Sequence, residues 1–199
     1  MKILIIGATG TIGKAVVSEL SARHEIVQAG RSLAPLRVDI ASEASLRELF
    51  GTVGAIDAIV CAAGNVHFGP LATMTVDQFK IGLGDKLLGQ VQLTLIGAQH
   101  LTDGGSITLT SGILSRDPIK LGTNATTVNA AVEGFVRAAA IELPRGIRIN
   151  AVSATVVVES LEAYGAYFRG FEAVPVRRVA NAYAKSVEGA QTGQVYAVG

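Results

Sequence analysis

The chain has 199 residues, of which 49% are hydrophobic, and its 17 basic and 16 acidic residues leave a formal net charge of +1. This length predicts one domain, spanning residues 1–199, with a core of useful size. The balanced charge and the absence of Trp argue against a nucleic-acid-binding surface. Apolar runs stay well short of 18 residues, so no membrane span is expected. The single cysteine, Cys61, excludes a disulfide within the chain, and we expect a reducing, cytoplasmic setting.

Short apolar runs alternate with helical patterns along the chain. The first run, residues 3–6, is too short for a secretory leader and leads directly into a glycine loop, so it predicts a strand. Ser42 is the expected N-cap of the second helix, with Ser45 as the alternative. From apolar spacing we expect strands at 3–6, 25–29, 37–40, 55–62, 106–110, 147–152 and 194–198. The expected helices are 11–23, 42–50, 76–100, 124–143 and 176–188.

Strands separated by helices predict an α/β fold. The order of elements indicates a doubly wound, Rossmann-type domain with about seven parallel strands and helices on both faces. The link between residues 30 and 36 is shorter than a parallel crossover normally requires. Either a helix has been reduced to a loop there, or the third strand is misplaced.

Residues 7–13 read Gly-Ala-Thr-Gly-Thr-Ile-Gly and follow the first strand directly. Glycines three residues apart permit a tight turn and let a pyrophosphate approach the backbone, while the next helix offers free N–H groups and the positive end of its dipole. The alternative is a turn that needs glycine only for packing. The motif predicts a dinucleotide site that includes Gly7, Thr9, Gly10, Thr11, Ile12 and Gly13.

The second strand ends in Ala-Gly-Arg-Ser at residues 29–32. NAD-selective sites place an acidic residue here to bind the ribose hydroxyls. In this chain Arg31 and Ser32 stand in its place, and a guanidinium can bind a 2′-phosphate through two hydrogen bonds. The sequence therefore favours NADP(H) over NAD(H), unless Arg31 is only a solvated surface charge.

Six stretches, in order along nearly the whole chain, resemble the short-chain dehydrogenase/reductase family. They are the glycine loop at 7–13, Val-Asp-Ile at 38–40, Cys-Ala-Ala-Gly at 61–64, Leu-Thr-Ser-Gly at 109–112, Asn-Ala-Ala-Val-Glu-Gly-Phe from 129, and Thr-Gly-Gln-Val-Tyr-Ala-Val-Gly at 192–199. The resemblance implies that the cofactor site also includes Asp39, Ile40, Ala62, Ala63, Gly64 and Asn129.

The family's catalytic groups are only partly present. In the family a tyrosine exchanges a proton with the substrate oxygen, and a lysine four residues later lowers the pKa of that tyrosine and holds the nicotinamide ribose. A serine orients the substrate, and a helix asparagine completes a proton relay. Aligned without gaps, Ala125 stands at the tyrosine position and Asn129 at the lysine position; a shift by one residue puts Asn124 and Val128 there instead, and neither register restores the pair. Lys86 replaces the helix asparagine, and Ser111 matches the serine.

The resemblance thus leaves Ser111, Lys86 and Asn129 as candidate catalytic residues. Ala125 cannot transfer a proton, and general acid–base catalysis contributes roughly 10²–10⁴-fold. Asn129 can still bind ribose hydroxyls, but it supplies no charge. If its helix faces Ser111 and Asn129, Lys86 returns a cation to the site or acts as the acid. The alternative is a solvated or interface lysine.

Three other features carry open alternatives. His67 is either a proton donor at the mouth of the cleft or a surface histidine. Cys61 is expected to be a small buried hydrophobe. Residues 156–175 stand in the place of the family's variable substrate lid, and their aromatic side chains either wall a small apolar pocket or pack against the sheet. These aromatic residues are Tyr164, Tyr167, Phe168 and Phe171.

Two functions follow from the sequence. The first is an oxidoreductase that uses NADP(H) on a small carbonyl or alcohol substrate with a non-standard proton donor, because hydride transfer itself is the cofactor's chemistry. The second is a catalytically degenerate NADP(H)-binding sensor or partner subunit. The expected partners are a small-molecule substrate and further copies of the chain, in a homodimer or homotetramer formed by the helices at 76–100 and 124–143. No metal, nucleic acid or membrane is expected.

Overall fold

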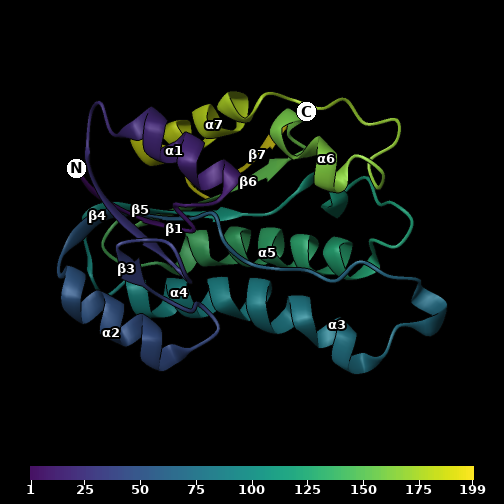
Figure 1. Cartoon of the computed structure of the whole chain (residues 1–199). Helices are drawn as coiled ribbons and strands as arrows, with labels where there is room; N and C mark the ends of the chain where they lie inside the picture. Colours follow the sequence, from purple (N-terminus) through teal and green to yellow (C-terminus); the bar gives the residue numbers. More distant parts are fainter.

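Seven parallel strands form one sheet in the structure, a computed structural model that describes residues 1–199 (Figure 1). The strands are β1 (Lys2–Ile6), β2 (Glu25–Gly30), β3 (Leu36–Arg37), β4 (Ile56–Cys61), β5 (Leu101–Thr110), β6 (Arg148–Ala154) and β7 (Val195–Val198). Their order across the sheet is β3-β2-β1-β4-β5-β6-β7. The winding reverses between β1 and β4, and doubly wound sheets bind their ligands at this point, outside the carboxyl ends of the strands. The predicted Rossmann-type α/β fold is confirmed.

Helices cover both faces of the sheet. In Figure 1, α1 (Thr11–Leu20) and α7 (Val176–Glu188) lie above it, and α2 (Glu43–Val53), α4 (Gly89–Gly97) and α5 (Thr123–Glu142) lie below. A further helix, α3 (Val76–Gly82), joins α4 through a π-helical turn at Leu83–Leu88. The short helix α6 (Leu161–Tyr164) belongs to the segment that follows β6.

The core lies in two layers, one on each face of the sheet. Along β1, Leu4 and Ile6 belong to a cluster of 22 buried residues on the face of α2, α4 and α5, whereas Ile3 and Ile5 belong to a cluster of 16 on the face of α1 and α7. This alternation follows from the two-residue period of a strand. Because both faces are covered, the strand is apolar throughout.

The third strand is present but shorter than predicted. It pairs with β2 only through Ala29–Leu36 and Gly30–Arg37, and no helix forms in the link between them. The chain then leaves the sheet, and the N–H of Asp39 donates to Ser45 Oγ and not to a strand. A loop suffices for this crossover because it returns the chain for only two paired residues.

Most other predicted elements lie where expected, with shifts at their ends. Ser42 caps α2 by accepting a hydrogen bond from the N–H of Ser45. The first helix ends at Leu20 rather than at residue 23, and β5 begins at Leu101 rather than at 106. The predicted helix 76–100 ends at Gly97 and contains the unpredicted π-helical turn.

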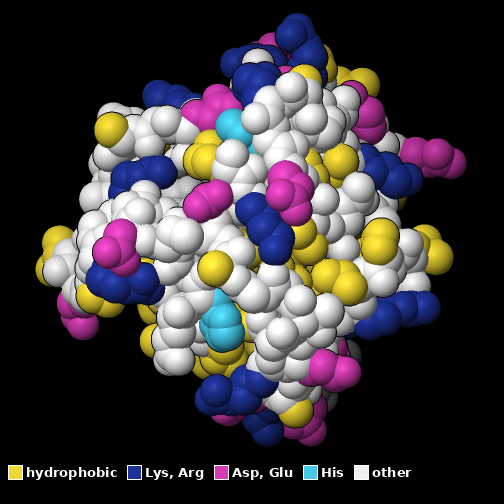
Figure 2. All heavy atoms as spheres, turned by 90° about the vertical axis from the view of Figure 1, so that its left-hand side faces the viewer, with side chains coloured by type: hydrophobic (Ala, Val, Ile, Leu, Met, Phe, Trp, Pro, Cys, Tyr) yellow, Lys and Arg dark blue, Asp and Glu magenta, His cyan; other side chains and the backbone are white.

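The face in Figure 2, at the amino ends of the strands, carries basic and acidic side chains side by side and only small separate apolar patches. No helix of the structure has the length and apolar character that crossing a membrane requires. No group of three or more His, Cys, Asp or Glu side chains is arranged to hold a metal ion.

Candidate active site

The glycine loop joins β1 to α1 at the reversal point of the sheet. Gly7 has a φ of +81°, and a Cβ there would lie 2.5 Å from the carbonyl oxygen of Ala62; a Cβ on Gly13 would lie 2.0 Å from the oxygen of Gly7. Gly10, the N-cap of α1, differs, because its Cβ would meet nothing closer than 3.4 Å. Packing therefore requires Gly7 and Gly13 but not Gly10. No side chain caps α1, so the N–H groups of its first turn stay available to an anion.

Arg31 lies at the rim of this groove, where β2 ends. Its Nη2 donates to Asp39 Oδ1 (3.2 Å) and to Asp85 Oδ1 (3.1 Å). The Asp85 carboxylate, with Asp39, raises the pKa of Arg31 above its usual value. Asn65 Nδ2 in turn donates to Asp85 Oδ2 at 2.6 Å. Arg31 is thus a paired cation on the rim. Its ion pairs connect the end of β2 to Asp39 after β3 and to Asp85 in the π-helical turn.

A cavity of about 340 Å³ opens at the carboxyl ends of β4, β5 and β6. It is lined by the three candidate catalytic residues, by Ile12 and by residues 62–64. Apolar side chains form most of its wall, and Lys86 is the only charged residue among those lining it. The wall includes Val66, Phe68, Ile113, Leu114, Val156, Val157, Tyr164 and Phe168.

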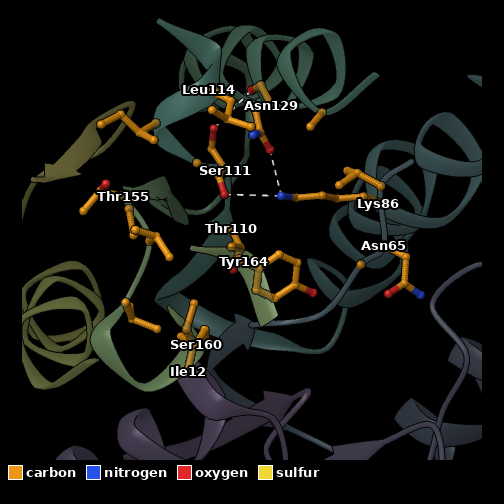
Figure 3. A pocket seen from close by; sticks show the side chains of 18 of the residues that line it. Ile12, Asn65, Lys86, Thr110, Ser111, Leu114, Asn129, Thr155, Ser160 and Tyr164 are labelled. Carbon is orange, nitrogen blue, oxygen red and sulfur yellow. Dashed lines mark hydrogen bonds between the residues drawn. The ribbon is translucent and has the colours of Figure 1, made fainter. Parts of the chain in front are cut away.

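Lys86 projects from the π-helical turn into this cavity (Figure 3). Its Nζ donates to Asn129 Oδ1 at 2.7 Å and to the main-chain oxygen of Ser111 at 3.3 Å. The side chain is only 8% exposed and has no acidic partner, and burial lowers its pKa from 10.5 to about 8. An ammonium carries three N–H donors, so one is left for a ligand. The sequence hypothesis that Lys86 faces Ser111 and Asn129 matches this geometry.

Gly64 makes room for the Lys86 side chain. It has a φ of +125°, and a Cβ there would lie 2.7 Å from Lys86 Cγ and 2.9 Å from its Cα. Any other residue would combine a strained backbone with a direct clash. The Cys-Ala-Ala-Gly stretch therefore contributes the space for the cation as well as a wall of the cavity.

The Ser111 hydroxyl turns away from Lys86, towards α5 (Figure 3). Its Oγ lies 2.7 Å from Glu133 Oε1 and 3.2 Å from the main-chain oxygen of Asn129. Ser115 Oγ donates to the same Glu133 oxygen at 2.6 Å. Sequence reasoning missed Glu133, although it follows Asn129 by four residues and so lies on the same face of a helix. In this structure Ser111 holds Lys86 through its carbonyl, and Glu133 fixes Ser111.

A family profile described as enoyl-(acyl carrier protein) reductase matches residues 9–195 of the chain. The chain belongs to the short-chain dehydrogenase/reductase family. It is similar to the solved structure of lin1944 from Listeria innocua, with 46% identity, full coverage of both chains and a TM-score of 0.98. A small-chain dehydrogenase solved in complex with NADPH is 28% identical, with 100% of this chain and 96% of that chain covered and a TM-score of 0.88. The comparison with curated proteins gave no match.

Ala125, which the sequence alignment sets at the family's tyrosine position, lines the cavity with a methyl group. His67 does not line the cavity, and its main-chain N–H donates to Asn124 Oδ1 at 2.8 Å. Cys61 is fully buried, as expected, and burial raises its thiol pKa to about 12.

The segment after β6 resolves the alternatives left open for its aromatic residues. Tyr164 and Phe168 line the cavity. Tyr167 packs on Phe68, with ring centroids 5.1 Å apart, and Phe171 packs edge-on against Phe168 at 5.4 Å. Two of the four aromatic side chains thus form the cavity wall, and the other two support it from behind.

Proposed function

We propose that the protein binds NADP(H) along the carboxyl ends of β1, β2 and β4 and reduces a small, uncharged carbonyl compound, with Lys86 as the proton donor. The observation that carries this proposal is the Lys86 ammonium, buried in an otherwise uncharged cavity with one N–H free of protein acceptors. Asn129 carries no positive charge. Lys86, which comes from a different helical segment, supplies that charge to the site.

The groove fits a dinucleotide in two respects. Gly10 has no packing reason to be glycine, which is expected if a pyrophosphate passes close to its backbone. Arg31 lies where a 2′-phosphate would bind, and a solved relative that is 28% identical was obtained with NADPH. The glycine loop and the first turn of α1 would hold the pyrophosphate, Asp39 and Ile40 the adenosine, and Asn129 the nicotinamide ribose.

Bound NADPH would supply a hydride to the carbonyl carbon. The carbonyl oxygen then gains negative charge, and the free N–H of Lys86 stabilises it and transfers a proton. A pKa of about 8 makes Lys86 a stronger acid than an ordinary lysine while keeping it mostly protonated at neutral pH, which suits a general acid. Asn129 Oδ1 and the Ser111 carbonyl hold Nζ in place during this step.

The cavity also limits the substrate. Its walls are aliphatic and aromatic, and its volume of about 340 Å³ must hold the nicotinamide as well. A carboxylate among these walls would lose its hydration without a partner. We therefore expect benzaldehyde-sized, uncharged aldehydes and ketones to be reduced faster than analogues that carry a second, ionised group.

The test has two parts. NADPH and NADH are titrated by fluorescence, and NADPH oxidation is then followed at 340 nm with a panel of aldehydes and ketones. We expect tighter binding of NADPH than of NADH, and measurable oxidation that Lys86→Met lowers by about 10²-fold or more. Equal affinity for the two cofactors removes the NADP(H) preference, and unchanged turnover in Lys86→Met removes Lys86 from the mechanism.

A protein that binds NADP(H) without turnover is the second candidate, and Ala125 at the tyrosine position is the observation that favours it. The same titration separates the two, because this candidate binds NADPH with no oxidation across the panel.

Self-association is the third element of the proposal. Three apolar side chains spaced seven residues apart along α3 to α4 are exposed, namely Ile81 (46%), Leu88 (52%) and Leu95 (62%), and so is Ile141 of α5 (86%). Several large apolar side chains left exposed on helical segments indicate a packing face. We expect a dimer or tetramer by light scattering at micromolar concentration, and a monomer after Leu88→Glu.

A further inference from the structure

Two arginines with different surroundings lie at the rim where β2 and β3 end. Arg31 is engaged by two carboxylates through a single nitrogen, Nη2. Arg37 Nη1 donates to the main-chain oxygen of Arg31 at 3.0 Å and forms no ion pair. The guanidinium of Arg37 is therefore anchored beside Arg31 and is not neutralised. Sequence reasoning considered only Arg31.

We propose that Arg37 binds the ribose 2′-phosphate together with Arg31, and that Asp85 opposes this binding by competing for Arg31. The inference rests on the proposed NADP(H) site and adds two residues that determine its selectivity. It predicts opposite effects for the loss of Arg37 and the loss of the Asp85 charge.

The number of free N–H donors on Arg37 supports its proposed role. A guanidinium presents five N–H donors, and the hydrogen bond to the Arg31 carbonyl uses one of them. That bond joins Arg37 to the loop after β2, where the 2′-position of the ribose is recognised in this fold. A phosphate at this place would find an uncommitted fork of donors, which is the geometry that binds phosphate well.

The role of Asp85 follows from its burial and its second contact. Asp85 is 16% exposed, against 46% for Asp39, so solvent screens its charge less. Asn65 also holds the Asp85 carboxylate at 2.6 Å, which keeps it close to Arg31. An incoming phosphate meets this fixed negative charge, whereas a ribose hydroxyl could donate to it. Asp85 therefore lowers the preference for a 2′-phosphate without blocking the site.

The experiment compares two ligands that differ only in the 2′-phosphate, adenosine 2′,5′-bisphosphate and AMP. Calorimetric titration of the full chain gives the ratio of their dissociation constants. We expect Arg37→Ala to reduce the preference for the bisphosphate about tenfold and Asp85→Asn to increase it about threefold. Arg47→Ala and Asp77→Asn are matched controls, because each removes an exposed charge from a surface ion pair that includes neither Arg31, Arg37 nor Asp85, and both should leave the ratio unchanged.

The outcomes separate this inference from the proposed cofactor site. If wild-type protein binds neither nucleotide, both the cofactor site and the inference are wrong. If it binds both and Arg37→Ala keeps the wild-type ratio, only the role of Arg37 is overturned. A ratio that falls or stays constant in Asp85→Asn overturns the competition and makes Asp85 a residue that positions Arg31. Thermal unfolding of each variant confirms that the ratios come from folded protein.

Discussion

Replacing Lys86 with methionine should stabilise the protein at neutral pH. Burial lowers the Lys86 pKa from 10.5 to about 8, so at pH 7 the folded chain carries a charge that it disfavours relative to the unfolded chain. At about 1.4 kcal/mol per pH unit, this difference corresponds to about 3 kcal/mol. Methionine keeps the bulk of the side chain, but the lost hydrogen bonds to Asn129 and Ser111 offset about 1–2 kcal/mol. We expect the free energy of unfolding of Lys86→Met to exceed that of the wild type by about 1–2 kcal/mol.

The gain should depend on pH in a defined window. Between pH 8 and 10.5 the unfolded chain binds more protons at Lys86 than the folded chain does. The free energy of unfolding of the wild type therefore rises with pH in this window, relative to that of the variant. The advantage of Lys86→Met is constant below pH 8 and shrinks above it.

Urea unfolding at pH 7, 8, 9 and 10 measures this directly. Lys80→Met is the control, because Lys80 lies on α3 with its side chain 66% exposed, and its difference from the wild type should not follow the same trend. A stability difference between wild type and Lys86→Met that stays constant from pH 7 to 10 would show that Lys86 keeps its charge in the folded protein up to pH 10.

Three further substitutions test the site. Gly64→Ala forces a left-handed backbone and a clash with Lys86, so it should cost about 2 kcal/mol in urea unfolding; Gly84→Ala, with nothing within 4 Å of its Cβ, should change stability far less. Glu133→Ala removes the acceptor shared by two buried or half-buried serine hydroxyls and should cost about 2–4 kcal/mol by the same assay. Gly10→Ala should lower the free energy of unfolding by less than about 1 kcal/mol. It should weaken NADPH binding about tenfold or more in a fluorescence titration, because the pyrophosphate needs close approach to the backbone. A loss of binding free energy no larger than the loss of unfolding free energy would contradict this.

The strands and the glycine loop were predictable because their signals are local. Continuous apolar runs fit a sheet that is buried on both faces, and Gly13 is required by a contact within the loop, with the oxygen of Gly7. The contact that requires Gly7 is with Ala62 after β4, so only the spacing of the glycines, and not this contact, was visible locally. The third strand was less predictable, since at its end Ser45 takes the N–H of Asp39. That competition between a side chain and the sheet cannot be read from apolar spacing.

The position of Lys86 could be inferred, but the orientation of the Ser111 hydroxyl could not. The family resemblance placed Lys86, Ser111 and Asn129 on elements that face each other, and the hydrogen bonds agree. The hydroxyl of Ser111 instead follows Glu133, and choosing between Lys86 and Glu133 needs atomic distances. The partners of Arg31 were equally hidden, because Asp85 lies 54 residues away in the chain.

The role of Lys86 as proton donor is measured by the pH dependence of carbonyl reduction, compared between wild type and Lys86→Met. We expect kcat/KM for NADPH-dependent reduction of an uncharged aldehyde to be constant below pH about 8, the pKa of Lys86, and to fall about tenfold per pH unit above it. Lys86→Met should still bind NADPH but lose about 10²-fold or more in kcat/KM. A wild-type profile that is flat to pH 10, or a Lys86→Met variant with wild-type kcat/KM, would show that Lys86 is not the proton donor.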